Sequence, residues 1–161
     1  MAAMMNTETW ELASYVVTVV GLPVAIAIFL YEQRKERENE EEAGYQMLSD
    51  AYGEFLQVVL ANPDLRLRSA AHTPDLSADQ RERQQIIFEM LISLFERAYL
   101  VAYRPGMVGE ELRRWNSWED YMREWCRRED FCRLLPQLLR GEDPDFARYI
   151  AALASEEQSA E

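Results

Sequence analysis

Two cysteines and one histidine are the side chains of this sequence best suited to act as a nucleophile, a base or a metal ligand. Cys126 and Cys132 are six positions apart and lack the closely spaced partners that a zinc site needs, and His72 is remote from both in sequence. Nucleophilic catalysis also requires a neighbouring base, yet His72 stands in a stretch without helical periodicity. We therefore expect two small core cysteines, a solvated histidine, no metal and no cofactor.

Carboxylates are abundant, but their positions favour solvation over acid–base chemistry. Residues 40–42 stand in a charged run, and Asp143 and Asp145 open a predicted helix. Glu89 and Glu96 are two helical turns apart, like half of a carboxylate metal site, but the Glu-x-x-His pattern of such sites is missing. The motifs GxGxxG, GxxxxGK[ST] and HExxH do not occur either. The sequence thus predicts a protein that is not an enzyme.

Aromatic residues are concentrated at Trp115, Trp118, Tyr121 and Trp125. Such rings commonly fill the core of a small helical domain, but Trp and Tyr are also enriched where one protein binds another. Trp118 and Tyr121 fit the core-facing stripe of the predicted helix least well. We therefore expect these two side chains to lie on the surface and to contact a partner.

Residues 12–30 form the densest apolar block in the chain and contain no charged side chain. A helix of about 19 residues spans about 29 Å at a rise of roughly 1.5 Å per residue, close to the hydrocarbon thickness of a bilayer. Apolar side chains cover every side of this helix, and Trp10, Tyr15 and Tyr31 stand where aromatic rings favour the headgroup region. We predict a transmembrane helix over 12–31 rather than a cleaved signal peptide, because no basic residue precedes it.

The basic residues nearest to this block are Arg34, Lys35 and Arg37, all on its C-terminal side. By the positive-inside rule, residues 1–11 should be outside and the rest of the chain cytoplasmic, in a single-pass protein of a bacterial inner membrane. Gly21 and Pro23 interrupt the apolar run. They are either a tolerated kink or a surface that packs against another membrane helix, so both are candidate partner-binding residues.

The overall charge is −12, from 17 basic and 29 acidic residues. This charge opposes binding to nucleic acid, which we exclude as a partner. Residues 32–44 combine helix-favouring side chains with alternating charge and have no apolar face, so they predict a solvated stalk that continues the membrane helix.

The remaining pattern is helical, and no segment alternates apolar and polar residues as a sheet requires. A helix from Tyr45 should stop near Asn62, and a second should start with a capping box at Ser77 and continue to Tyr103. Three shorter amphipathic helices should follow. We predict an all-α fold in which residues 45–154 form a bundle of about four to five helices and residues 155–161 form a frayed acidic tail.

This arrangement resembles a group of bacterial single-pass membrane proteins classed as a domain of unknown function. The resemblance is carried by LANPDLRL at 60–67, LFERAYL at 94–100, the tryptophan pair Trp115 and Trp118, and DFARYI at 145–150. It implies an N-terminal transmembrane helix, a charged neck and a small helical cytoplasmic domain. It implies no activity, because the group has none to carry over.

Two functional hypotheses fit these observations best. The first is a non-enzymatic accessory or scaffolding subunit, anchored in the lipid bilayer, that binds other membrane or cytoplasmic proteins, or itself, through its helical domain and its anchor. The alternative is a membrane effector of a stress or phage-defence system, whose cytoplasmic domain senses a partner or ligand. An enzyme with an unrecognised site is a third hypothesis, which the absence of acid, base and nucleophile sets disfavours.

Overall fold

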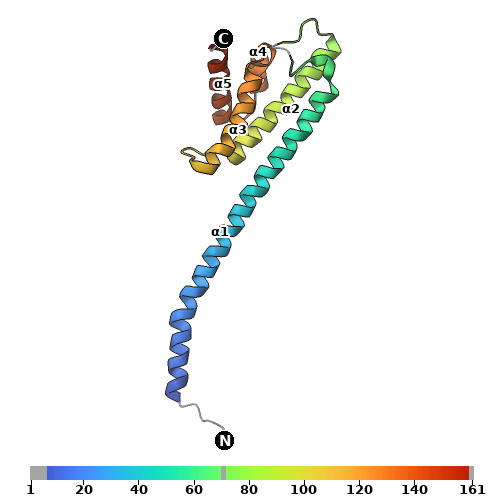
Figure 1. Ribbon diagram of the computed structural model, residues 1–161. Coiled ribbons are helices and arrows are strands. Elements are labelled where there is room, and N and C mark those ends of the chain that lie inside the picture. The colour runs from blue at the N-terminus through green and yellow to red at the C-terminus, as the bar shows by residue number, and fades with distance from the viewer. Residues whose placement is uncertain (1–6, 70–71, 160–161) are drawn as a thin grey trace. The chain divides into compact units, whose positions relative to one another are not determined.

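The computed structural model describes the backbone of residues 7–69 and 72–159, and the side chains of 22–37, 39–40, 42–69 and 72–159. Within these residues the chain is all-α, as predicted, and has no strand (Figure 1). The elements are α1 (Thr7–Ala61), the short 3-10 helix η1 (Pro63–Leu65), α2 (Ala78–Ala102), α3 (Gly109–Cys126), α4 (Glu129–Leu138) and α5 (Pro144–Ser159). The chain divides into two compact units, Met1–Ala43 and Gly44–Glu161.

The first unit contains the N-terminal part of α1. The predicted span 12–31 is helical, with Pro23 inside the helix, but the side chains of 12–21, including the position of Gly21, lie outside the described residues. Among the described residues, none of the helices has the length and apolar character needed to cross a membrane. Helical backbone continues through the charged run 32–42, which confirms the helix predicted there.

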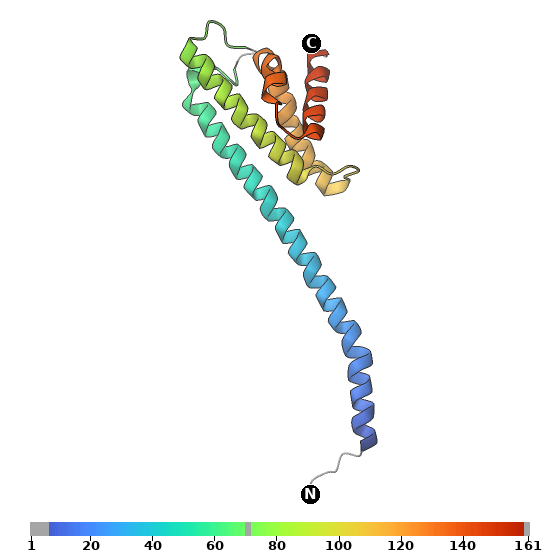
Figure 2. The same ribbon diagram turned by 180° about the vertical axis from the view of Figure 1, so that it is seen from behind.

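The second unit begins with the C-terminal part of α1. Its buried side chains are Leu48, Tyr52, Phe55 and Val59, which belong to the aromatic stripe that the sequence predicts. The helix ends at Ala61, because Pro63 pushes the residue before it out of the helical conformation. α2 then runs alongside this part of α1, as both ribbon views show (Figure 2).

α2 starts with the predicted capping box. The Ser77 hydroxyl accepts a hydrogen bond from the Gln80 backbone N–H (3.2 Å), and the Gln80 side chain accepts one from the Ser77 N–H (3.0 Å). The helix ends at Ala102, and Gly106 continues the turn with φ +81°, a conformation that favours glycine. Capping and turn chemistry thus fix both ends of α2 where the sequence predicts them.

α3, α4 and α5 complete the core. α3 buries Trp115, Trp118, Met122 and Trp125. α4 contains Pro136, an exposed residue of its last turn, where proline leaves one helical hydrogen bond unmade. The N-cap of α5 is Asp143, whose Oδ1 accepts the Phe146 N–H at 3.0 Å, as predicted.

The prediction that the chain frays from Ser155 is wrong for residues 155–159, because they continue α5. Arg123 of α3 pairs with Glu156 at 2.9 Å and with Glu157 at 3.1 Å, and Arg127 pairs with Glu157 at 2.7 Å. Hydrogen bonds from Arg127 and then from Arg123 lower the pKa of Glu157. These pairs tie the acidic end of α5 to α3, so it does not behave as a solvated tail.

Candidate functional site

A buried ion pair between Arg128 and Asp130 is the least expected feature of the helical unit. The two residues are 5% and 2% exposed. Arg128 donates from Nε to Asp130 Oδ1 at 2.9 Å and from Nη2 to Oδ2 at 2.6 Å. This two-point geometry matches the guanidinium fork to both carboxylate oxygens, which is the strongest form of such a pair.

Hydrogen bonds with two other segments, α2 and the connection between α1 and α2, complete this buried polar cluster, defined here as Arg128, Asp130, Gln84 and Thr73. Asp130 Oδ2 also accepts the Gln84 side-chain amide at 2.9 Å and the Thr73 backbone N–H at 3.3 Å. Arg128 Nη1 donates to the backbone carbonyl of Leu67 at 2.8 Å. The cluster therefore joins α2, α4 and the connection between α1 and α2 at one point.

Sequence reasoning missed this cluster. Arg128 and Asp130 stand at the start of a short amphipathic helix, where charged residues normally face water. The only available signal was the number of charges around the connection between α3 and α4, and this signal does not distinguish a buried pair from an exposed one.

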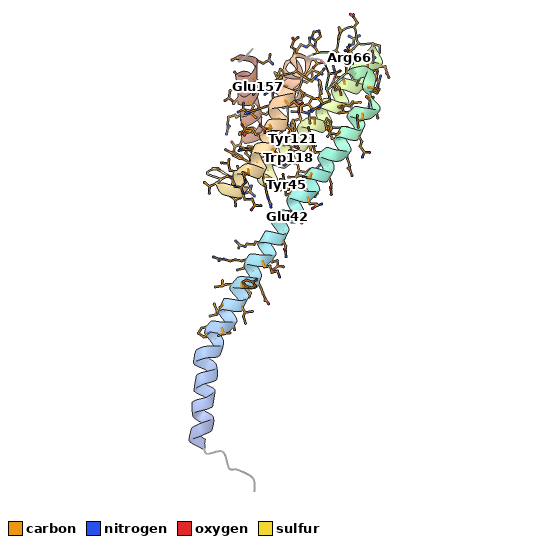
Figure 3. The ribbon with its side chains drawn as sticks, in the orientation of Figure 1. Glu42, Tyr45, Arg66, Trp118, Tyr121 and Glu157 are labelled. Atoms are coloured by element: carbon orange, nitrogen blue, oxygen red, sulfur yellow. The ribbon has the colours of Figure 1, made fainter. Side chains whose placement is uncertain are left out.

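The two residues predicted to contact a partner from the surface of α3 are labelled in Figure 3, and they differ in exposure. The prediction that Trp118 lies on the surface is wrong. Its side chain is 2% exposed and lies edge-on to Tyr52, with 5.8 Å between the ring centroids. Tyr121 is 37% exposed and stacks on Tyr52 at 4.4 Å. Of these two residues, Tyr121 alone has an exposed side chain.

The thiols and the histidine form no catalytic set. Cys126 is buried, and a hydrogen bond with Cys132 together with burial raises the pKa of its thiol. Cys132 Sγ donates to the Cys126 carbonyl at 2.8 Å. His72 is exposed, and its Nδ1 lies 3.3 Å from Oε2 of Glu129. In the part of the chain that the structure describes, it forms no hydrogen bond with either cysteine. Within the described residues, no group of three or more His, Cys, Asp or Glu side chains could hold a metal ion.

Glu142 is the carboxyl group with the most raised pKa among the described residues. Burial, then a hydrogen bond with Glu96, then the charge of Glu96 raise its pKa to about 7. Glu96 is itself held in place, because its Oε1 accepts the backbone N–H of Asp143 at the start of α5. The two carboxyl groups therefore hold a proton at a pH where isolated glutamates have lost theirs.

We expect this pair to make the helical unit less stable as the pH rises from about 4.5 to about 7. The folded state keeps its proton on Glu142 longer than the unfolded chain does, so the contribution is complete below the unfolded pKa and is lost as the pH rises through the folded pKa. Solvent screens the partly buried group, so the effect is modest. Melting temperatures of Glu142→Gln should change less between pH 5 and pH 8 than those of the wild type. Equal pH dependence for Glu142→Gln, the wild type and the exposed control Glu111→Gln would contradict this expectation.

The fold and the site define an all-α protein with an aromatic core and a buried Arg–Asp cluster. No family model, no curated protein and no solved structure matches the chain. The resemblance to bacterial membrane proteins of unknown function therefore stays a prediction.

Proposed function

We propose that the protein is a non-enzymatic, membrane-anchored accessory subunit that binds another protein of a membrane assembly through its helical domain and its anchor. The observation that carries this proposal is an apolar stripe on the outward face of α2, which we call the α2 outer stripe. It consists of Ile86, Met90, Leu100 and Val101, all exposed. Val101 stands at the edge of the stripe, where its Cγ1 is 3.6 Å from the position that a Cβ of Gly44 in α1 would take.

The stripe is a second apolar face on a helix that already buries one. The inner face of α2 packs Ile87, Phe88, Leu91 and Phe95 into the core. Along the chain, Met90 follows Ile86 by four residues, Leu100 follows Met90 by ten, and Val101 comes next. In a helix of 3.6 residues per turn these separations place the four side chains on one side. Exposed large apolar side chains opposite a buried face favour a partner on that second side, although charged residues such as Glu89 and Arg97 share it.

The stripe has the length and exposure of a helix-binding face. Ile86 is 49% exposed and Leu100 is 53% exposed. Their separation along α2 is about 21 Å at a rise of roughly 1.5 Å per residue. Exposed Ser93 and Arg97 lie on the same face between Met90 and Leu100, so the stripe has two apolar ends and a polar centre. Exposed apolar surface rimmed by polar residues commonly marks a protein contact. The partner that fits is an amphipathic helix laid along α2.

The anchor supports the membrane part of the proposal. Residues 12–31 are apolar and uncharged up to Leu30, and basic residues follow only on the C-terminal side. Gly21 would allow a second membrane helix to approach closely, and Pro23 leaves a backbone carbonyl free to bond across an interface. Tyr121 offers a further exposed aromatic contact on the helical unit.

Interaction with a partner is tested by charge substitutions at the two ends of the stripe. Ile86→Glu and Leu100→Glu each place a carboxylate in the proposed contact, and each should weaken partner binding at least tenfold. Both positions are exposed, so folding should survive, which circular dichroism checks. The matched control is Asn116→Glu, which adds the same charge to an exposed position of α3.

The measurement is co-purification of the tagged full-length chain from membranes washed at alkaline pH and then dissolved in mild detergent. The wild type and Asn116→Glu should retain a stoichiometric partner that both stripe variants lose. Recovery of the chain in the wash would refute the anchor. Retention of the same partners by all four proteins, or a wild type that runs as a lone monomer, would refute the binding role.

A further inference from the structure

A groove beside the buried polar cluster has the size of a small-molecule site. Its volume is about 530 Å³, within the range of ligand pockets in proteins. Three segments form it: residues 72–76 of the connection, the first turns of α2, and α4. The lining side chains used below are Arg81, Gln84, Thr73, Arg133, Leu76 and Leu134.

The floor of the groove is held rigid by the buried polar cluster. Thr73 and Gln84 line the groove, and both donate to Asp130, which is in turn fixed by Arg128. The loop wall includes Asp75 at φ +54°, a left-handed conformation that aspartate adopts more readily than most non-glycine residues. The groove is therefore formed before any ligand arrives, which reduces the entropic cost of binding.

The charge of the groove is opposite to that of the chain as a whole. Arg81 and Arg133 line it, and within the described residues neither forms an ion pair; Arg81 donates only to the backbone carbonyl of Ser77, at 3.4 Å. Elsewhere in the helical unit, Arg83 and Arg123 are paired with carboxylates, whereas Arg97 and Arg140 also lack an ion pair within the described residues. The groove differs in bringing two such guanidinium groups to one site. Asp75 is the one acidic residue of the lining. A protein of net charge −12 thus leaves two guanidinium groups unpaired at one concave site.

We propose that this groove binds a small organic phosphate, with the phosphate between Arg81 and Arg133 and an apolar group against Leu76 and Leu134. Two guanidinium groups match the charge of a phosphate monoester, which is between about −1.5 and −2 at neutral pH. Each guanidinium can donate two parallel hydrogen bonds to phosphate oxygens. Thr73 also lines the groove, and its hydroxyl donates to the Leu65 carbonyl at 2.5 Å, which fixes this wall in place.

Calorimetric titration of the full-length chain in mild detergent with phenyl phosphate tests this assignment. We expect saturable binding to the wild type, about tenfold weaker binding to Arg81→Gln and to Arg133→Gln, and unchanged binding to Arg97→Gln. Arg97 is an exposed arginine of α2 outside the groove. The three variants carry the same change of charge, so a general electrostatic effect would weaken all of them equally.

Two further probes separate the parts of the proposal. Inorganic phosphate should bind more weakly than phenyl phosphate, because it leaves the apolar lining empty, and neutral benzyl alcohol should not bind measurably. The proposal is overturned if phenyl phosphate gives no saturable heat, if Arg97→Gln weakens binding as much as the groove variants, or if either probe binds as tightly as phenyl phosphate. None of these results bears on partner binding by the α2 outer stripe.

Discussion

Replacing Asp130 with alanine should lower the free energy of unfolding of the helical unit by about 3 to 5 kcal/mol. The substitution leaves the Arg128 guanidinium buried without the carboxylate that compensates its charge. It also removes the acceptor of Gln84 and of the Thr73 backbone, so the connection between α1 and α2 loses one of its links to α4 and keeps the bonds from Arg128 to the Arg66 and Leu67 carbonyls. The cost is the desolvation of an unpaired charge, which is larger than the net contribution of the intact pair.

The measurement is urea unfolding of the full-length protein in mild detergent, followed by tryptophan fluorescence. The control Asp120→Ala removes an exposed carboxylate of α3 and should change the free energy by no more than about 0.5 kcal/mol. If Asp130→Ala and Asp120→Ala unfold at the same urea concentration, the Arg128–Asp130 pair does not hold the fold together. Replacing both cluster residues, as in Arg128→Met with Asp130→Leu, should restore part of the loss because no unpaired charge remains.

Phe95→Ala should lower the free energy of unfolding by about 3 to 5 kcal/mol for a different reason, because it creates a cavity in the core. Phe95 is fully buried on the inner face of α2. A small domain has a total stability of only about 5 to 15 kcal/mol, so this loss removes a large part of it. The result should appear as a lower urea midpoint with retained helical circular dichroism in the absence of denaturant.

Met90→Ala is the matched control, because it truncates a large apolar side chain on the same helix at an exposed position. We expect a change below about 1 kcal/mol there, since the Met90 side chain is 43% exposed and its truncation leaves no enclosed cavity. A loss for Phe95→Ala as small as that of Met90→Ala would mean that α2 does not pack its inner face as described.

The helices could be predicted from the sequence because their signals are local. Apolar spacing of three and four residues marks Leu48, Tyr52 and Phe55 in α1, and all three are buried. The capping box at Ser77 and the cap at Asp143 depend on residues within one helical turn. Such features need no knowledge of what lies across the core.

Trp118 could not be placed from its helix alone. α3 packs against α2, α4 and α5, and its Trp118 ring meets Tyr52 of α1. A helix surrounded in this way buries a wider sector than a single stripe, so a residue at the edge of the stripe becomes core. The sequence pattern shows which side of a helix is apolar, but the number of neighbours decides how much of the helix is covered.

The candidate groove also depends on distant parts of the chain. Arg81 and Arg133 are 52 positions apart, and each by itself is an ordinary charged residue of an amphipathic helix. Burial of Arg128 and Asp130 is equally invisible in a sequence, because charged side chains are almost never fully buried unless they are paired. The burial of the Arg128–Asp130 pair and the groove between Arg81 and Arg133 arise only when the fold brings α2 and α4 together.

The bonds from Arg128 to backbone carbonyls have a consequence for the variation that homologous chains could tolerate. Arg128 Nη1 binds the carbonyl oxygens of Arg66 at 3.2 Å and of Leu67 at 2.8 Å, so it recognises the path of the main chain rather than the side chain at position 66. Position 66 has φ +47°, so glycine or asparagine there would keep the same hydrogen bonds and relieve the backbone. Diverged homologues should therefore retain arginine and aspartate two positions apart at the start of α4 while the loop sequence drifts, and a search for them should weight that spacing above the letters of the loop.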